Sequence, residues 1–345
     1  MTGRVAVVLF NLGGPDRPEA IRPFLFNLFN DPAIIRRPRP LRWALARLIS
    51  RRRAPEARRI YQRLGGRSPL REQTEAQARA LERELGDPRF RTFVSMRYWH
   101  PMADAVADEV VRFDPARVVL LPLYPQFSST TTASSLRDWA RAARGKLEAA
   151  TTGICCYPEE PGFVEAAARH ISEILEDWEG PEPRILYSAH GVPKAFVEAG
   201  DPYRAQVERS AAAIRRTLRR EDLEHVVCYQ SRVGPLEWIG PYTDGEIARA
   251  GAEGKPLIVA PIAFVSEHSE TLVELDEEYR DLARASGVPA YRRAATVGTD
   301  PAFISGLAGL VGRALASSEP VMPGSGGRIC GKDDGDCPLA ARCAA

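Results

Sequence analysis

The chain has 345 residues, of which 44% are hydrophobic and 27% are charged, so it can bury a large core and is not a disordered sequence. Its 47 Lys and Arg residues nearly balance its 45 Asp and Glu residues, and the formal net charge of +2 argues against a nucleic-acid-binding protein. No apolar run reaches the roughly 18 residues that span a bilayer, and no signal peptide opens the sequence, so we expect a cytoplasmic protein.

Short apolar segments alternate with longer amphipathic segments along the chain. This alternation predicts an α/β fold, with mainly parallel sheets covered by helices on both faces. The predicted strands are residues 5–12, 90–98, 117–124, 184–189, 225–230 and 256–264. The clearest predicted helices are residues 72–84, 102–112, 163–177, 203–219 and 270–285.

Two pairs of similar segments predict two similar lobes. LFNLGGP at residues 9–15 is similar to LYSAHGVP at residues 186–193, and VVLLPLYPQFSS at residues 118–129 is similar to LIVAPIAFVSEH at residues 257–268. The proline-rich sequence PEP at residues 181–183 marks the expected boundary. We therefore expect an N-terminal lobe at residues 1–180, a C-terminal lobe at residues 181–317 and an extended, unpacked tail at residues 318–345.

Residues 37–53, RPRPLRWALARLISRRR, combine apolar and basic side chains without any acidic residue. The apolar positions include Leu41, Trp43 and Leu48. An apolar face with basic flanks is typical of a lip that touches a membrane surface or a large apolar ligand. An ordinary surface helix is the alternative interpretation, and both stay open at this point.

Several reactive or aromatic side chains directly follow predicted strands. Arg97 and Tyr98 follow the second strand, Ser128 opens a hydroxyl-rich run after the third, His190 ends the fourth, and Trp238 follows the fifth. In open α/β sheets, ligands bind beyond the carboxyl ends of the strands. Aromatic walls with arginine and hydroxyl groups suit a large flat ligand with acidic edges.

The segment after the last strand carries Glu270, Glu274 and Glu278 at four-residue spacing, which places the three carboxylates in one row on a helix. Like charges at this spacing cost a few tenths of a kcal/mol per pair (about 0.2–0.5), so a solvated acidic face and a functional row are both open. The row lies beside His268 at a strand end, and carboxylates with imidazole suit Fe(II). His190 could be a structural histidine, but a neutral imidazole at a strand end can also take a proton or ligate a metal.

Taken together, these motifs resemble the ferrochelatase family, whose members insert Fe(II) into a porphyrin. The similarity covers residues 4–315, and its most specific parts are SAHGVP at residues 188–193 and SEHSETLVELDEEY at residues 266–279. It implies a chelatase-like fold of two Rossmann-like lobes, each a mainly parallel, four-stranded type of sheet, with the ligand cleft between the lobes. A nucleotide-dependent enzyme is disfavoured, because no phosphate-cradling glycine pattern follows the first strand.

The resemblance also implies roles for single residues. His190 and Glu270 would flank the porphyrin centre as catalytic and iron-binding groups. The resemblance leaves open which of the two accepts the pyrrole protons and which ligates the iron. The other implied positions are Glu274 and Glu278 on a metal route, Arg97, Tyr98 and Trp238 on the macrocycle, and a porphyrin-gripping, membrane-facing lip near residues 37–53.

The resemblance further implies that the chain makes protohaem from protoporphyrin IX and Fe(II), with release of two pyrrole protons. Coproporphyrin III or another tetrapyrrole is the alternative substrate, and the apolar lip favours protoporphyrin. A non-catalytic carrier of tetrapyrrole or iron is a more distant alternative.

Three of the six cysteines crowd the C-terminal end of the chain. Some ferrochelatases hold a 2Fe-2S cluster with three C-terminal cysteines and one from mid-chain. The resemblance therefore implies a cluster on Cys330, Cys337 and Cys343 together with either Cys155 or Cys156, since neighbours on an extended segment face opposite ways. A zinc site is the alternative for the same thiols.

Overall fold

The structure is a computed structural model that describes residues 3–331 and 334–339. The chain forms two compact units, and contacts place the division after Cys156 rather than near residue 181. The first unit comprises Met1–Tyr124, Ser128–Cys156 and Ala308–Gly324, and the second comprises Pro125–Phe127, Tyr157–Leu307 and Ser325–Ala345. Helix α6 (Pro161–Glu176) belongs to the second unit because it packs on α8 (Tyr203–Leu218).

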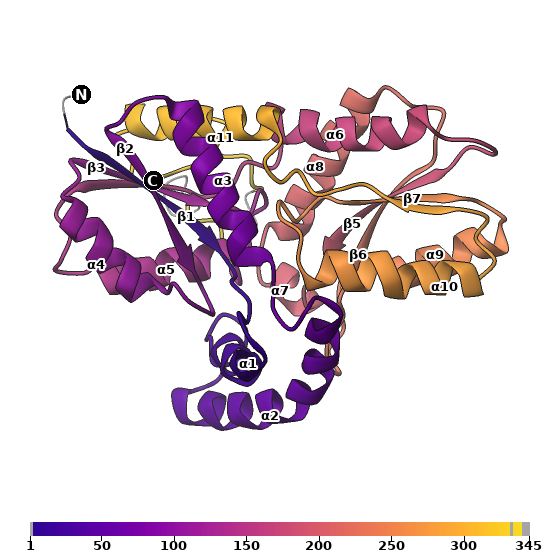
Figure 1. Cartoon of the computed structure of the whole chain (residues 1–345), viewed down its shortest axis with the longest axis horizontal. Coiled ribbons are helices and arrows are strands. Elements are labelled where there is room, and N and C mark those ends of the chain that lie inside the picture. The colour runs from indigo at the N-terminus through magenta and orange to yellow at the C-terminus, as the bar shows by residue number, and fades with distance from the viewer. Residues whose placement is uncertain (1–2, 332–333, 340–345) are drawn as a thin grey trace. The chain divides into compact units, whose positions relative to one another are not determined.

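The first unit contains a parallel sheet with strand order β2-β1-β3-β4-β9 (Figure 1). Every residue of its interior strand β1 is buried, as expected for a strand covered on both faces. The strands are β1 (Val5–Asn11), β2 (Phe90–Met96), β3 (Arg117–Pro122), β4 (Ala150–Ile154) and β9 (Val321–Met322). The helices are α1 (Ile21–Phe29), α2 (Arg39–Arg63), α3 (Leu70–Leu85), α4 (Ala103–Phe113) and α5 (Thr132–Ala143), with α11 (Pro301–Ala316) shared between the units.

Two strands of this sheet were missed by the sequence analysis. Strand β4 is short and contains Gly153, so its apolar signal is weak. Strand β9 lies in the predicted unpacked tail, where Val321 and Met322 pair with Gly153 and Ile154. The expectation of an entirely unpacked tail was therefore wrong, because an edge strand of two residues needs only a free neighbouring edge and leaves no periodic pattern.

The second unit contains a parallel sheet with strand order β6-β5-β7-β8. One face packs against α9, α10 and the helical segment Glu270–Glu278 that leads into α10. The shared core contains Leu186, Val259 and Leu275 (Figure 1). The strands are β5 (Arg184–His190), β6 (His225–Gln230), β7 (Leu257–Pro261) and β8 (Tyr291–Arg293). The remaining helices are α7 (Lys194–Glu198), α9 (Thr243–Ala252) and α10 (Tyr279–Ala285).

The predicted fold class of two α/β lobes with parallel sheets is confirmed. The expected four strands occur in the second sheet, whereas β9 adds a fifth strand to the first. The six predicted strands and the helices at residues 72–84, 102–112, 163–177 and 203–219 all occur, with ends that shift by a few residues. The difference lies at residues 270–285. There the chain forms a π-helix, η2 (Glu270–Glu278), before it continues as α10.

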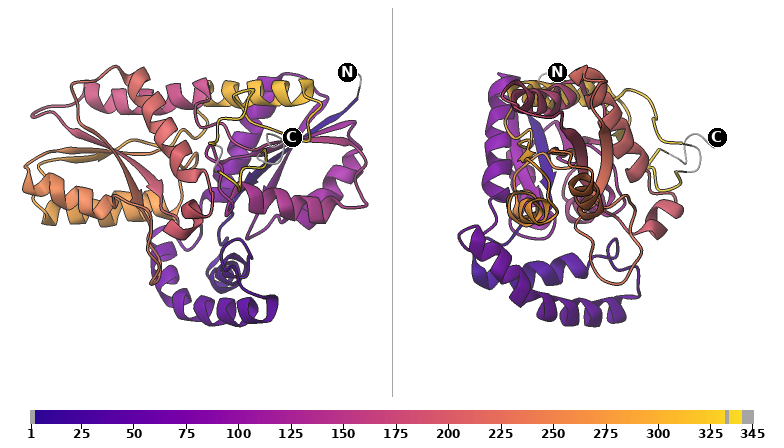
Figure 2. Two further views of the ribbon diagram at one scale, coloured as in Figure 1. Left: turned by 180° about the vertical axis from the view of Figure 1, so that it is seen from behind. Right: turned by 90° about the vertical axis from the view of Figure 1, so that its right-hand side faces the viewer.

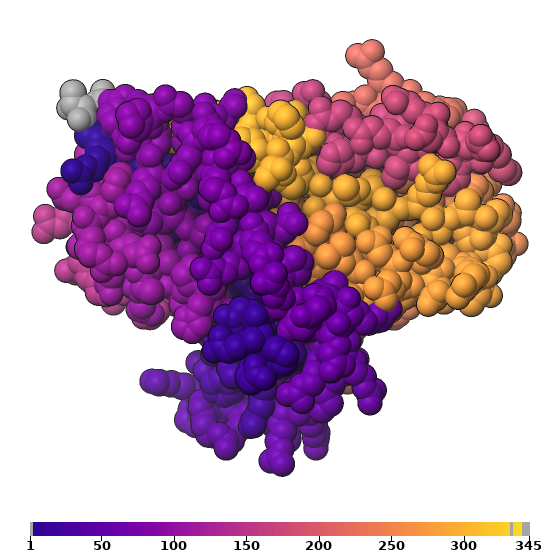
Figure 3. All heavy atoms as spheres, in the orientation of Figure 1, coloured from indigo at the N-terminus to yellow at the C-terminus, as the bar shows by residue number. Residues whose placement is uncertain are grey.

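Helices α1 and α2 lie beyond the carboxyl end of β1 (Figures 1 and 2). They pack on each other through a cluster that includes Phe24, Leu25 and Tyr61. The outer side of α2 exposes long side chains to solvent (Figure 3). Helix α2 contains most of the predicted lip.

Candidate active site

The structure brings His190 and Glu270 together. His190 is the last residue of β5, and Glu270 is the first residue of η2, shortly after β7. Because β5 and β7 are parallel neighbours, their carboxyl ends meet at one edge of the sheet. Nε2 of His190 lies 3.8 Å from Oε1 of Glu270, and each side chain is about one third exposed, at 35% and 34%. The pair is therefore accessible to a ligand.

The hydrogen bond of His190 determines which ring nitrogen carries its proton. Nδ1 lies 2.5 Å from the carbonyl oxygen of Gly191. A carbonyl oxygen only accepts, so Nδ1 carries the hydrogen and donates it. In the neutral ring, Nε2 then presents a lone pair toward Glu270. That nitrogen can accept a proton or ligate a metal ion.

Two aromatic rings lie beside His190. The ring centroids of Trp238 and Phe264 are 6.1 Å and 6.5 Å from the imidazole centroid. The indole can approach because residue 191 is glycine: a Cβ there would lie 3.0 Å from Cε3 of Trp238 and 3.2 Å from the carbonyl oxygen of Gln230. The predicted aromatic wall and the predicted imidazole therefore belong to one site.

Glu274 is held by four hydrogen-bond donors. The backbone N–H of Ser231 and the hydroxyl of Tyr279 donate to Oε1 over 2.9 Å and 3.0 Å. Gln230 Nε2 donates to Oε2 over 3.0 Å, and so does the Ser231 hydroxyl. Ser231 has a φ of 64°, a left-handed backbone conformation that residues other than glycine rarely adopt. Burial and the nearby charge of Glu270 raise the pKa of Glu274.

His268 lies two residues before the start of η2 and accepts a hydrogen bond. The backbone N–H of Glu270 donates to its Nδ1 over 3.0 Å, and the ring of Phe264 packs edge-on at 4.4 Å. Burial lowers the pKa of His268, because the charged ring would lose its water. The imidazole therefore stays neutral near pH 7 and orients the start of η2.

The π-helical form of η2 corrects the expectation of a regular helix at residues 270–278. A π-helix bonds each N–H to the carbonyl five residues back, and such turns are frequent at functional sites. Glu270 and Glu274 both lie partly buried at the strand-end edge, whereas Glu278 is exposed at the last position of η2. Among residues 3–331 and 334–339, no cluster of three or more His, Cys, Asp or Glu side chains is arranged to hold a metal ion.

Arg97 and Tyr98 belong to a buried network in the first unit. Asp31, whose side chain is 2% exposed, accepts hydrogen bonds from Arg97 over 2.8 Å and from the Tyr98 hydroxyl over 2.9 Å. Arg97 also donates to the Ser134 hydroxyl over 2.7 Å. Ser128 is buried as well, and its hydroxyl is hydrogen-bonded to the hydroxyl of Thr130. Sequence reasoning missed Asp31, because nothing in the local pattern distinguishes it from other acidic residues.

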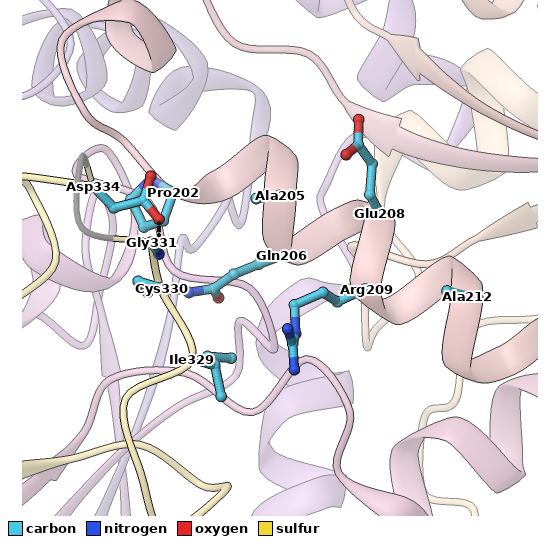
Figure 4. A pocket seen from close by; sticks show the side chains of 10 residues that line it. All are labelled: Pro202, Ala205, Gln206, Glu208, Arg209, Ala212, Ile329, Cys330, Gly331 and Asp334. Atoms are coloured by element: carbon cyan, nitrogen blue, oxygen red, sulfur yellow. Dashed lines mark hydrogen bonds between the residues drawn. The ribbon is translucent and has the colours of Figure 1, made fainter.

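The tail cysteines form a pair in the second unit. Cys330 hydrogen-bonds to Cys337, and this contact lowers the pKa of the Cys337 thiol to about 6. Gln206 of α8 donates to the Cys330 sulfur over 3.2 Å. A cavity of about 340 Å³ lies between α8 and this part of the tail (Figure 4). Cys343 lies outside the described residues.

Cys155 and Cys156 are both buried just after β4 in the first unit. Their sulfur atoms lie 3.6 Å apart. The expectation that these neighbours face opposite ways was therefore wrong, because the chain has left the extended strand conformation at this point.

A family model described as Ferrochelatase matches residues 4–315. The chain belongs to the ferrochelatase family. The ferrochelatase of Phenylobacterium zucineum is 57% identical over 310 residues, covering 88% of this chain and 90% of the relative. The ferrochelatase of Caulobacter vibrioides is 52% identical and covers 98% of both chains, and that of Hyphomonas neptunium is 50% identical and covers 99% and 96%.

Solved structures support the fold of this ferrochelatase-family chain. SirB from Bacillus subtilis with Fe3+ has a TM-score of 0.56 at 12% identity, covering 91% of this chain and 97% of that chain. The sirohydrochlorin chelatase SirB from the spizizenii subspecies, in complex with cobalt, has a TM-score of 0.54 at 11% identity, covering 90% and 94%. The predicted chelatase-like fold is confirmed.

Proposed function

We propose that this member of the ferrochelatase family inserts Fe(II) into protoporphyrin IX, forming protohaem and releasing two pyrrole protons. The enzyme is a metal chelatase of the lyase class. The observation that carries the proposal is Nε2 of His190 facing the carboxylate of Glu270 at 3.8 Å, while Nδ1 of the same ring bonds the Gly191 carbonyl. A proton acceptor and an anionic metal ligand side by side are what exchange of protons for a metal ion requires.

The chemistry requires a base at the ring centre. A free porphyrin is flat and carries two N–H groups, so a metal ion can enter only as the ring bends and the protons leave. His190 takes the two protons in turn on Nε2 and passes the first to solvent before it accepts the second, and the nearby carboxylate of Glu270 stabilises the imidazolium each time. Trp238 and Phe264 press on the apolar face of the ring, and binding energy from such contacts offsets the cost of bending.

Iron is the substrate, so the protein should hold it only briefly. A site with three or four protein ligands would retain the ion, whereas His190 and Glu270 supply only two. The four ring nitrogens can then displace these ligands. Glu278 is exposed and Glu274 is partly buried, so the carboxylates of η2 form a route from solvent toward Glu270.

The test is anaerobic incubation of the purified protein with Fe(II) and each porphyrin, followed through the loss of free-porphyrin fluorescence. We expect His190→Ala and Glu270→Gln to lose at least about 100-fold in kcat while porphyrin binding persists. Full activity of His190→Ala, or porphyrin binding without iron insertion by the parent protein, would refute the proposal. The second result would instead identify a carrier.

The metal route has its own test. Glu278→Gln should raise the KM for iron about threefold to tenfold and leave the porphyrin KM unchanged, because one carboxylate of the row is lost. Glu277→Gln is the matched control, since it removes an equal charge from the same helix outside the row. Equal effects of the two substitutions would show that only the general charge of η2 matters.

We also propose that the enzyme is cytoplasmic and touches the membrane peripherally through α2. The same apolar surface would favour protoporphyrin over the more polar coproporphyrin III. Leu41, Trp43 and Leu48 are 50%, 48% and 46% exposed, and basic residues surround them. No helix in the described part of the chain is long and apolar enough to cross a bilayer. Replacing the three residues with serine should weaken binding to anionic vesicles about tenfold. Val111→Ser, at an exposed apolar position of α4, should not.

We finally propose that Cys330, Cys337 and Cys343, with Cys155 or Cys156, hold a 2Fe-2S cluster. The contact between Cys330 and Cys337 supports this, because a cluster needs converging thiolates. Such a cluster supplies a one-electron redox centre when it is bound. Anaerobically purified protein should contain iron and acid-labile sulfide in equal amounts. Cys337→Ser should lose both and the buried control Cys228→Ala should keep them, whereas zinc without sulfide would refute the cluster.

A further inference from the structure

Strand β8 contacts η2 through side chains that no catalytic role explains. Tyr291 and Arg293 are two residues apart, so they lie on the same face of the strand, and Arg292 lies on the other face. The Tyr291 hydroxyl donates to the backbone carbonyl of Leu275, inside η2, over 2.8 Å. Arg292 is instead stacked on the ring of Trp178. One face of this short strand is therefore dedicated to η2.

The guanidinium of Arg293 joins two separate points of the η2 segment. Its Nε and Nη2 donate to the two carboxylate oxygens of Asp276 over 2.7 Å and 2.8 Å. Its Nη1 donates to Oε1 of Glu267 over 2.9 Å and to the carbonyl oxygen of Ala294 over 3.2 Å. Asp276 lies in the second half of η2, and Glu267 lies before its first residue. Arg293 thus bonds to one residue that precedes Glu270 in the sequence and to one residue that follows it.

The position of Glu267 connects this clamp to the reactive pair. Glu267 is followed by His268, whose Nδ1 accepts the backbone N–H of Glu270. The same Glu267 oxygen accepts the backbone N–H of Thr296, which fixes it from a second segment. A shift of Glu267 would therefore move His268 and change the distance between Glu270 and His190.

A π-helix needs such outside support. This helix form is rare, so the chain adopts it only where the surroundings hold it. The side chains of Arg293, Glu267 and Asp276 are only 10%, 19% and 22% exposed, so water screens these ion pairs weakly. A planar guanidinium can bind a carboxylate with two parallel hydrogen bonds while reaching another acceptor, which a lysine ammonium cannot do.

We propose that Arg293 is a positioning residue for iron insertion: it clamps Glu267 to Asp276, holds residues 270–278 in the π-helical form, and so sets the placement of Glu270 opposite His190. This inference rests on the proposed function, because it matters for catalysis only if Glu270 takes part in the reaction. Arg293 itself touches neither of the proposed reacting groups.

The first test compares Arg293→Gln and Arg293→Lys with the matched control Arg292→Gln. Amide hydrogen exchange in peptides covering residues 268–280 should be about tenfold faster in Arg293→Gln, while residues 203–218 and the control stay unchanged. The kcat should fall about 10-fold to 100-fold, with the porphyrin KM within about twofold of the parent, because the loss concerns placement and not ring binding. Arg293→Lys should recover part of the kcat. Parental exchange and kcat in Arg293→Gln would overturn the inference.

A second variant separates positioning from simple stability. Arg293→Gln leaves Glu267 and Asp276 without their partner, which alone could destabilise the unit. Combining Arg293→Met with Glu267→Gln and Asp276→Asn removes all three charges and should restore the melting temperature, but neither the slow exchange of residues 268–280 nor the kcat. Recovery of kcat together with melting temperature would overturn the inference. If the parent protein and Arg292→Gln both fail to insert iron, the proposed function fails, and the exchange data alone decide whether Arg293 holds η2.

Discussion

Gly191→Ala should disturb the aromatic wall of the active site without touching a reactive group. The new Cβ would lie 3.0 Å from Cε3 of Trp238 and 3.2 Å from the carbonyl oxygen of Gln230. Carbon atoms in good contact lie about 3.5–4.0 Å apart, so the indole must retreat by about 0.5 Å. The Gln230 carbonyl cannot retreat as easily, because it accepts the backbone N–H of Gly191 over 2.9 Å.

The expected cost is about 1–3 kcal/mol, the usual range for overpacking. A change of 1 kcal/mol lowers the melting temperature of a unit this size by about 2–4 °C, so the effect is measurable by thermal unfolding. We expect the porphyrin KM to rise, because the displaced indole no longer meets the ring. Gly245→Ala is the control: a Cβ at this position of α9 meets no atom within 4 Å, so we expect no loss of stability.

A double variant identifies the obstacle. If Trp238 is the group in the way, Trp238→Leu should reduce the cost of Gly191→Ala, and the two substitutions should not be additive. Unchanged stability and an unchanged porphyrin KM in Gly191→Ala would refute the reasoning. So would a cost that Trp238→Leu does not reduce, since the clash would then lie elsewhere.

Three further predictions follow from buried groups. Asp31→Asn should destabilise the first unit by about 3–5 kcal/mol, seen as a lower midpoint in urea, because the mostly buried Arg97 loses its ion pair. Burial raises the pKa of Cys228 to about 12, so at pH 8 only about one thiol in ten thousand is ionised, and iodoacetamide should not label it before unfolding. Ser231→Ala removes one donor from Glu274, so the pKa of Glu274 should rise further, and the acid limb of the pH–rate profile should move to higher pH; an unmoved profile would contradict this.

The arrangement of the strands and the strand-end residues could be predicted from the sequence. The buried strands are short apolar runs, and parallel strands bring their carboxyl ends to one edge. For this reason His190 and Glu270, 80 positions apart in the sequence, could be expected to meet. Glu274 was predicted from its spacing, but its donors Gln230 and Ser231 were not, because they lie at the end of β6, far from η2 in the sequence.

The sequence by itself determined the two α/β lobes and singled out the apolar and basic stretch at residues 37–53 and the candidate reactive side chains, because these depend on local apolar periodicity and on motifs that are continuous in the chain. Only the tertiary structure decided that residues 270–278 form a π-helix, that Asp31 engages Arg97 and Tyr98, and that Arg293 clamps Glu267 to Asp276. These features depend on contacts between segments far apart in the chain. Such contacts leave no local pattern, since a charged residue looks the same in the sequence whether it is solvated or paired in the interior.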